Sequence, residues 1–199
     1  MKISEIFYSL QGEGARTGTP TIFIRTSGCK AKFACYKLGI RCDTEFESGK
    51  EMSIDEILQW IENNANECKE ITWTGGEPTD QLTEEIVKIF KDKGYYQAIE
   101  TSGLNKVPEG IDFICISPKV AEHVIKKNFR DTIIDELRYV RHKGQDIPQP
   151  MIKAKHYWIS PHSDGFTING ENLQHCINLT LKNPKWKLSV QNHKIWNVL

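Results

Sequence analysis

The sequence has no apolar run that approaches the length of a membrane-spanning helix. It has no formal net charge either, because 26 Lys and Arg residues balance 26 Asp and Glu residues. A balanced charge gives no general attraction to nucleic acid or to an anionic membrane. The opening, MKISEIFYSLQGEG, lacks the apolar core and the cleavage site of a signal peptide. We therefore expect a cytoplasmic protein with no nucleic-acid or membrane partner.

The chain also lacks internal repeats, low-complexity tracts and any linker rich in Pro or Ser. Its 199 residues are enough to bury a substantial core, so we expect a single domain over residues 1–199. In a protein without an export signal, six cysteines are expected to be reduced thiols or metal ligands rather than disulfides.

Strand-like and helix-like patterns alternate along the chain. This alternation predicts an α/β domain with a mainly parallel sheet and right-handed crossovers. Strands are predicted at 2–9, 21–26, 70–74, 95–100, 113–117, 135–141, 156–160 and 187–191, and helices at 54–63, 82–93 and 171–181. Ser53 and Glu56 form a capping-box pattern at the first helix, and Gly94 ends the second. The pattern at 135–141 is also compatible with a helix, although a strand is favoured, and residues 120–129 favour neither state.

Five unusual turns each follow the end of a predicted strand. They are the cysteine loop at 27–44, GGEP at 75–78, ETSG at 100–103, SPK at 117–119 and SPHS at 160–163. In barrels and open α/β sheets, ligand sites form at the carboxyl ends of the strands. The five turns are therefore expected to converge on one rim and to form a binding site there.

Three cysteines, Cys29, Cys35 and Cys42, lie close together with the spacing C-x5-C-x6-C. Three thiolates cannot complete the four-ligand cage of a structural zinc site, but they can hold three irons of a 4Fe–4S cluster and leave the fourth open. The spacing alone leaves two alternatives, a zinc knuckle completed by a histidine and chance clustering. The remaining cysteines (Cys68, Cys115 and Cys176) are predicted to be structural.

The GGEP and QGEG turns each have a plain and a functional interpretation. GGEP is either an ordinary strand-to-helix turn or a place where two glycines expose backbone groups to a ligand and Glu77 accepts from an amine. QGEG, at 11–14, is either a mere turn or a wall whose backbone and Glu13 hydrogen-bond a flat heterocycle.

Three charged residues at strand ends have similar alternatives. Glu100 and Lys119 are either a solvated rim pair, or partners of hydroxyl, amine or polar cofactor groups. Arg25 is either an edge-strand charge or a guanidinium that pairs a substrate carboxylate in bidentate fashion.

Taken together, the motifs resemble the 7-carboxy-7-deazaguanine synthase family of the radical S-adenosylmethionine (SAM) superfamily over nearly the whole chain. The segments that carry the resemblance are EIFYSLQGEG at 5–14, FIRTSGC at 23–29, CDTEF at 42–46, TGGEP at 74–78, ETSG at 100–103, SPK at 117–119, DELRYV at 135–140 and the ending VQNHKIWNVL. The superfamily usually spaces its cluster ligands C-x3-C-x2-C, whereas the gaps here are five and six residues. ISPHSDG at 159–165 matches the family's cofactor-holding turn only loosely.

The resemblance implies an incomplete (β/α) barrel of the radical SAM type, usually a homodimer, that acts as a carbon–nitrogen lyase. It implies a 4Fe–4S cluster, SAM, Mg²⁺ and an external electron donor. The implied reaction contracts the ring of a pterin substrate, 6-carboxy-5,6,7,8-tetrahydropterin, to 7-carboxy-7-deazaguanine with loss of ammonia, as in queuosine-type 7-deazapurine biosynthesis. The rivals are an activase that installs a glycyl radical on a partner protein and a non-enzymatic zinc-binding module.

The resemblance also implies site residues, with no catalytic side chain beyond the cluster and cofactor ligands. Cys29, Cys35 and Cys42, in a loop spanning 27–52, would hold the cluster, and Thr44 the Mg²⁺. The cofactor would be bound by Asp43, Gly76, Glu77, Glu100, Ser117, Pro118, Lys119, Ser160, Pro161, His162 and Ser163. The substrate would be bound by Leu10, Gln11, Gly12, Glu13, Arg25, Thr74 and the terminal Leu199.

Overall fold

The computed structural model describes residues 1–37, 42, 44–163, 165 and 167–198. Its strands are β1 (Lys2–Leu10), β2 (Pro20–Thr26), β3 (Lys50–Glu51), β4 (Glu70–Gly75), β5 (Tyr96–Thr101), β6 (Phe113–Ile116), β7 (Ile134–Arg141), β8 (Ala154–Pro161) and β9 (Trp186–Leu188). Its helices are α1 (Lys32–Lys37), α2 (Ile54–Ala65), α3 (Glu84–Asp92), α4 (Glu122–Ile125), α5 (Gly170–Lys182) and α6 (Asn192–Trp196), with 3₁₀ turns at Gly14–Arg16, Pro78–Asp80 and Lys126–Phe129.

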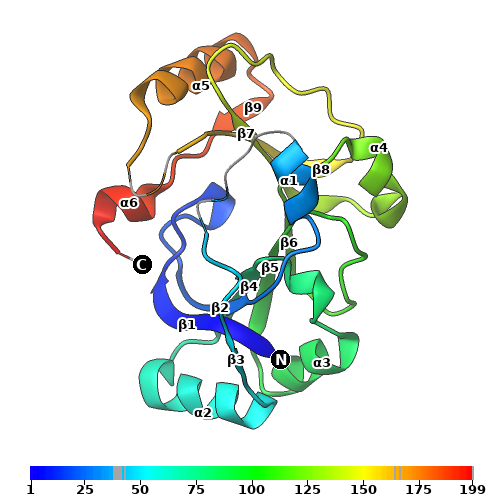
Figure 1. The fold of residues 1–199 in the computed structure, drawn as a ribbon, viewed down its shortest axis with the longest axis vertical. Helices are drawn as coiled ribbons and strands as arrows, with labels where there is room; N and C mark the ends of the chain where they lie inside the picture. Colours follow the sequence, from blue (N-terminus) through cyan, green and yellow to red (C-terminus); the bar gives the residue numbers. More distant parts are fainter. Residues whose placement is uncertain (38–41, 43, 164, 166, 199) are drawn as a thin grey trace.

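The strands form one nine-stranded sheet in the order β3-β1-β2-β4-β5-β6-β7-β8-β9. From β2 onward every neighbouring pair is parallel, whereas β1 is antiparallel to both β2 and β3. The sheet curves like an incomplete barrel with α2, α3 and α5 on its outer side, and its end strands β3 and β9 do not pair in the described part of the chain (Figure 1). This confirms the predicted α/β fold with a mainly parallel, open barrel.

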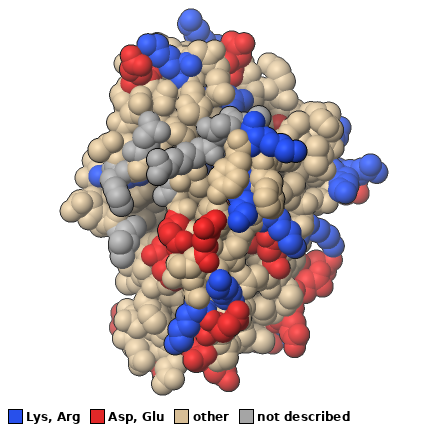
Figure 2. Space-filling view, viewed as in Figure 1, with Lys and Arg blue, Asp and Glu red and all other residues tan. Residues whose placement is uncertain are grey.

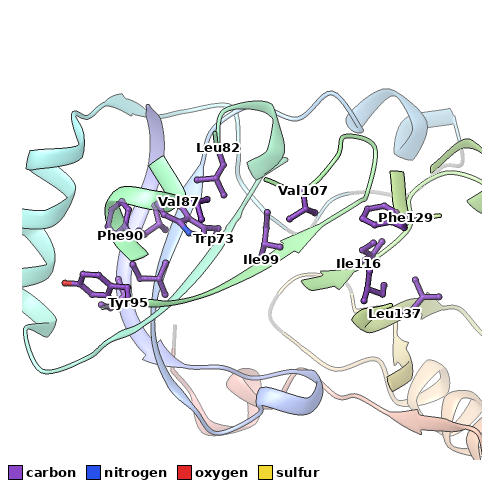
Figure 3. Close-up of a cluster of buried hydrophobic side chains, with 14 of the residues drawn as sticks. Trp73, Leu82, Val87, Phe90, Tyr95, Ile99, Val107, Ile116, Phe129 and Leu137 are labelled. Atoms are coloured by element: carbon purple, nitrogen blue, oxygen red, sulfur yellow. The ribbon is translucent and has the colours of Figure 1, made fainter. Parts of the chain in front are cut away.

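The outer face of the sheet carries the apolar core. Trp73 on β4 and Ile99 on β5 are fully buried, and the Trp73 ring packs edge-on against Phe90 of α3 with 5.1 Å between the ring centroids (Figure 3). Trp73 also donates from its indole nitrogen to the Gln97 side chain at 2.9 Å. Because side chains alternate along a strand, the neighbouring residues must face the inside of the barrel.

The inner face is unusually polar for the inside of a folded domain. The strand register aligns Arg25 of β2 with Thr74 of β4, Glu100 of β5 with Cys115 of β6, and Cys115 with Glu136 of β7. A row of charged and polar side chains therefore crosses the inside of the barrel. Since buried charges are costly unless they are paired, this row marks the region where function is expected.

The two best-defined helices form where the sequence predicts them. Ser53 and Glu56 make the full capping box at the start of α2, with hydrogen bonds of 2.7 and 3.2 Å between their side chains and backbone amides. At α3, the Thr83 hydroxyl accepts from the Ile86 amide, and Gly94 lies beyond its end at φ +79°. Both predictions are confirmed to within two residues at each end.

The prediction of a last strand at 187–191 is partly wrong, since β9 ends at Leu188. The Ser189 amide still donates to Ile159 of β8 at 2.9 Å, but its hydroxyl accepts from the Gly14 amide at 3.0 Å. The chain then turns, with the Asn192 amide bonded to the Val190 carbonyl, and enters α6. Beyond Leu188, contacts with the loop that follows β1 therefore replace strand pairing.

No helix in the described part of the chain is both long and apolar enough to cross a membrane. In the face seen in Figure 2, Lys and Arg side chains are intermingled with Asp and Glu side chains rather than gathered in a patch of one sign. This mixture agrees with the balanced composition.

Candidate active site

The cysteine loop is joined to the GGEP turn through backbone contacts. The Glu77 amide donates to the Gly28 carbonyl at 2.9 Å, and the Gly28 amide donates to the Phe46 carbonyl at 2.7 Å. A Cβ atom on Gly76 would overlap the Gly28 carbonyl. Gly76 therefore serves close packing between two strand ends, and two of the five predicted turns do meet.

Glu77 joins this assembly to the ETSG turn. It is only 1% exposed, and its carboxylate accepts from the Thr101 hydroxyl at 2.6 Å and from the Ser102 amide at 2.9 Å. The Ser102 hydroxyl, the Thr79 hydroxyl at 2.6 Å and the Thr79 amide at 3.2 Å also donate to it. A cofactor amine would have to share oxygens that already fix the turns after β4 and β5.

Cys35 is close enough to Cys29 and to Cys42 for each pair to influence the pKa of a thiol. Burial raises the pKa of Cys29 to about 11, and the neighbouring Glu77 and Cys35 charges add to this rise. The pKa of Cys35 is also raised, mainly by burial. The Lys119 ammonium opposes this rise, and Cys42 adds to it. Because Lys119 of the SPK turn acts on Cys35 of α1, the SPK turn and the cysteine loop are neighbours.

The donor set fits an iron–sulfur cluster in its chemistry. Thiolates are the protein ligands of such clusters, and metal binding removes the protons that burial favours here. In the described ranges, no three His, Cys, Asp or Glu side chains stand at metal-holding distance. Residues 38–41 and Asp43, between Cys35 and Thr44, lie outside the described residues, as does Leu199.

The two remaining turns lie at the ends of β6 and β8. Lys119 donates from its ammonium to the Ser117 hydroxyl at 3.0 Å, and Pro118 lies between them. Ser160 and Ser163 are buried, and within the described part of the chain neither hydroxyl oxygen has a hydrogen-bond partner. Pro161 ends β8. Buried hydroxyls without partners are unusual and indicate a place for a bound polar group or water.

His162, in the same turn, stacks on His142 with 4.1 Å between the ring centroids. Its amide donates to the Arg141 carbonyl at 2.9 Å, which extends the β7–β8 pairing by one residue. The imidazole of His162 therefore lies against His142, the residue that follows β7.

Arg138 of β7 is the charged centre of the barrel interior, and the sequence interpretation did not select it. Its side chain is 7% exposed; Nη1 pairs with Glu13 at 2.9 Å and Nη2 with Glu100 at 3.1 Å and Glu136 at 3.3 Å. Nη2 also donates to the Cys115 sulfur at 2.9 Å. Glu136 and Arg138 are two residues apart in a strand, and this same-face charge pair is the signal that could have identified them.

These contacts keep the buried charges in place. Burial would raise the pKa of Glu100, but the charge and hydrogen bond of Arg138 and a hydrogen bond from Gln11 lower it overall. Burial also raises the pKa of Cys115 well above its ordinary value. It would lower the pKa of Arg138, but Cys115 and the three carboxylates raise that pKa well above its ordinary value. Glu100 is thus held as a carboxylate and Cys115 as a thiol.

The QGEG loop follows Leu10, the last residue of β1, and contacts residues of β5, β7 and α6. Gln11 donates from its amide side chain to Glu100 at 3.1 Å. Gly14 has φ +69°, and a Cβ there would overlap the Glu136 carboxylate. Gly12 similarly packs against His193 of α6. The motifs at the two ends of the sequence therefore form one wall.

Arg25 and Thr74, aligned on β2 and β4, both belong to the predicted substrate set. Thr74 is buried. The Arg25 Nε atom lies 2.7 Å from Glu5 Oε1, and the guanidinium lies over the Phe7 ring, 5.8 Å from its centroid. Arg25 thus has an acidic partner that the sequence interpretation did not foresee.

Comparisons with known proteins show what the chain is similar to. Residues 28–147 match the radical SAM superfamily. The chain is 37% identical over 198 residues to the 7-carboxy-7-deazaguanine synthase of Bacteroides thetaiotaomicron, covering 99% of this chain and 98% of the relative. It is 36% identical over 207 residues to that of Haemophilus influenzae, covering 97% and 92%. The crystal structure of QueE from Escherichia coli superposes with a TM-score of 0.70 at 22% identity over 96% of this chain and 93% of that one, a likeness of fold.

Proposed function

The chain belongs to the 7-carboxy-7-deazaguanine synthase family of the radical SAM superfamily, and from this we propose which site residues bind the cluster, the cofactor and the substrate. It is accordingly an enzyme, and the family resemblance expected from the sequence is confirmed. The reaction is the ring contraction of 6-carboxy-5,6,7,8-tetrahydropterin to 7-carboxy-7-deazaguanine with release of ammonia. Near-complete coverage of relatives at 36–37% identity favours this reaction over a glycyl-radical activase or a zinc module.

Cys29, Cys35 and Cys42 would hold the 4Fe–4S cluster that membership of the superfamily implies. When bound, the cluster and SAM supply one-electron chemistry that a protein side chain cannot perform. The cofactor would lie along the strand ends at Gly76, Glu77, Glu100, Ser117, Pro118, Lys119 and the turn at 160–163, with Asp43. The Ser160 and Ser163 hydroxyls, buried without partners in the described part, support a polar ligand there.

The substrate would occupy the polar inner face of the barrel. Leu10, Gln11, Gly12, Glu13, Arg25, Thr74 and Leu199 would line its site. The observation that carries this proposal is that Glu13, from the QGEG loop, and Glu100, from β5, are both held as partners of Arg138 inside the barrel. Glu100 would thus lie between the two ligands, with the cofactor on one side and the substrate on the other. Carboxylates fixed in this way can accept hydrogen bonds from the N–H edge of a pterin ring.

The other end of the substrate carries a carboxylate, which Arg25 and Mg²⁺ would recognise. Arg25 would exchange Glu5 for that carboxylate, and Thr44 would supply an oxygen ligand to Mg²⁺, a cation that prefers oxygen donors. Four expectations stay predictions: the single-domain organisation over 1–199, the homodimer, the external electron donor and the cytoplasmic location.

An anaerobic turnover assay tests the function. Cluster-loaded, reduced protein is given SAM, Mg²⁺ and 6-carboxy-5,6,7,8-tetrahydropterin, and the products are identified by mass spectrometry. We expect 7-carboxy-7-deazaguanine together with ammonia. Slow release of 5′-deoxyadenosine without a deazapurine would overturn the substrate assignment and favour the activase. Neither product from a verified cluster-loaded sample would overturn the enzymatic proposal altogether.

A further inference from the structure

Arg138 connects residues from four separate parts of the barrel. Its guanidinium contacts Glu13 of the QGEG loop, Glu100 of β5, Cys115 of β6 and Glu136 of its own strand, all within 3.3 Å. At 7% exposure its side chain is withdrawn from solvent. It is therefore placed to fix these groups relative to one another.

The contacts use the two terminal nitrogens of the guanidinium separately. Nη1 holds Glu13, and Nη2 holds Glu100. A guanidinium presents its donors in a rigid planar fork, so the positions of the two carboxylates are set together. A lysine ammonium carries the same charge but is a single point donor on a flexible stem.

Glu136 links the Arg138 guanidinium to the loop that follows β1. One of its oxygens accepts from Arg138, and the other accepts from the Ala15 amide. Its carboxylate also occupies the space that a side chain at Gly14 would need. Glu136 therefore ties Arg138 to the loop that carries Glu13, while Gln11 from the same loop donates to Glu100.

We propose that Arg138, anchored by Glu136, is a positioning residue that sets the spacing of Glu13 and Glu100 and thereby the affinity for the pterin ring. This inference rests on the proposed function, because it takes Glu13 and Glu100 to face the substrate. Arg138 itself need not touch the substrate, since its terminal nitrogens are occupied by protein groups.

The proposal is separable from a purely structural role. Three carboxylates around one guanidinium leave an excess of negative charge, so Arg138→Gln would place like charges together without compensation. Arg138→Lys retains the charge and loses the fork. A structural role predicts a smaller folded fraction with unchanged affinity in the molecules that fold, whereas a positioning role predicts weaker binding in folded protein.

The test is a binding titration on the cluster-loaded enzyme with SAM and Mg²⁺ but without reductant. The probe is 6-carboxypterin, an oxidised analogue that cannot turn over, and its dissociation constant is measured by calorimetry. Arg138→Lys is compared with Arg16→Lys. Arg16 is a similarly buried arginine whose guanidinium pairs with Glu70 at 2.7 Å and donates to the Thr72 hydroxyl at 3.1 Å, so it is anchored to β4.

We expect the dissociation constant to rise about tenfold in Arg138→Lys, more in Arg138→Gln, and less than about twofold in Arg16→Lys. In turnover, KM should rise by a similar factor while kcat changes little, the pattern of lost ground-state binding. Unchanged affinity in folded Arg138→Lys would overturn the proposal. Wild-type enzyme that binds no 6-carboxypterin would instead count against the proposed substrate, so the two failures are distinguishable.

The pH profile gives a further readout that folding does not supply. Arg138, Gln11 and Arg25 are the groups whose hydrogen bonds or charges favour the ionised form of Glu100. Removing Arg138 raises the pKa of Glu100, so Arg138→Gln should lose analogue binding at a higher pH than wild type does as the pH falls. An acid limb of analogue binding that stays in place in Arg138→Gln would contradict the proposal. If Arg138→Gln does not fold, Arg138→Lys decides the matter.

Discussion

The backbone of Gly76 packs directly on the backbone of Gly28. No Cβ atom could be accommodated at Gly76 without overlapping the Gly28 carbonyl, and the next residue donates its amide to that same carbonyl. The start of the cysteine loop is therefore held by the turn after β4. The site depends on this contact before any ligand binds.

Gly76→Ala should destabilise the fold and loosen the cysteine loop. The obstacle is backbone rather than a flexible side chain, so we expect a loss of about 1–3 kcal/mol in the free energy of unfolding. Gly170→Ala is the matched control, because a Cβ at Gly170 would meet nothing within 4 Å. Urea titration of both variants checks this, and equal midpoints would contradict it.

Cys35→Ala should lose the cluster as completely as Cys42→Ala. Three thiolates hold three of the four irons and leave one open for SAM, and Cys35 is the only cysteine between Cys29 and Cys42. Cys68→Ala is the control, since Cys68 lies in the segment between α2 and β4. Iron and acid-labile sulfide are measured after reconstitution. Normal iron and sulfide in Cys35→Ala would show that the middle ligand is misassigned.

The sequence predicts the fold well wherever one residue pattern decides the local structure. The capping box of Ser53 and Glu56 defines α2, and the apolar alternation around Trp73 and Ile99 defines the central strands. The last strand is misjudged because strand pairing ends at Leu188 and the Ser189 hydroxyl binds Gly14, a residue 175 positions away. No local pattern encodes a contact of that kind.

The candidate site is foreseen in its parts but not in its connections. The five strand-end turns were selected from their unusual residues, and Gly76, Glu77 and Glu100 are indeed found at strand ends. Glu77 binds two neighbouring turns, and Arg138 pairs with three carboxylates. Both roles depend on which side chains face each other across the barrel. That arrangement is a property of register between strands far apart in the sequence.

Gln97→Leu should destabilise the core around α3. Gln97 is fully buried, accepts from the Trp73 indole at 2.9 Å and donates to the Val87 carbonyl at 2.9 Å. Leucine leaves the indole nitrogen of Trp73 buried without an acceptor and removes the additional bond to Val87, and the unpaired donor alone costs about 1–3 kcal/mol. Gln59→Leu, at an exposed position of α2, should change stability by less than about 0.5 kcal/mol. Thermal unfolding of both variants would contradict the prediction if their midpoints coincided.

Thr44→Val should raise the Mg²⁺ concentration needed for half-maximal turnover, because valine keeps the shape of threonine but removes its oxygen. Cluster content and SAM binding should stay unchanged. Thr132→Val, at an exposed position, controls for the loss of a hydroxyl elsewhere. The measurement is activity against Mg²⁺ concentration, and superimposable curves for Thr44→Val and wild type would remove Thr44 from the proposed Mg²⁺ site.

Glu77→Gln separates two roles for the GGEP glutamate. If Glu77 serves only the amine of the cofactor, the variant should keep its stability and lose affinity for SAM. The structure gives its carboxylate protein partners instead, in the Thr101 hydroxyl, the Ser102 amide and the Thr79 hydroxyl. An amide in its place turns an acceptor into a donor against groups that already donate, so we expect a loss of about 1–3 kcal/mol.

Glu62→Gln, on the exposed face of α2, supplies the control and should change stability by less than about 0.5 kcal/mol. Urea unfolding of cluster-free protein measures the stability term without any cofactor, and calorimetry with SAM measures the binding term. A stable Glu77→Gln protein with weakened SAM binding would contradict the prediction and would mean that Glu77 serves only the cofactor. A destabilised variant would mean that the Glu77 carboxylate holds the turns after β4 and β5 together.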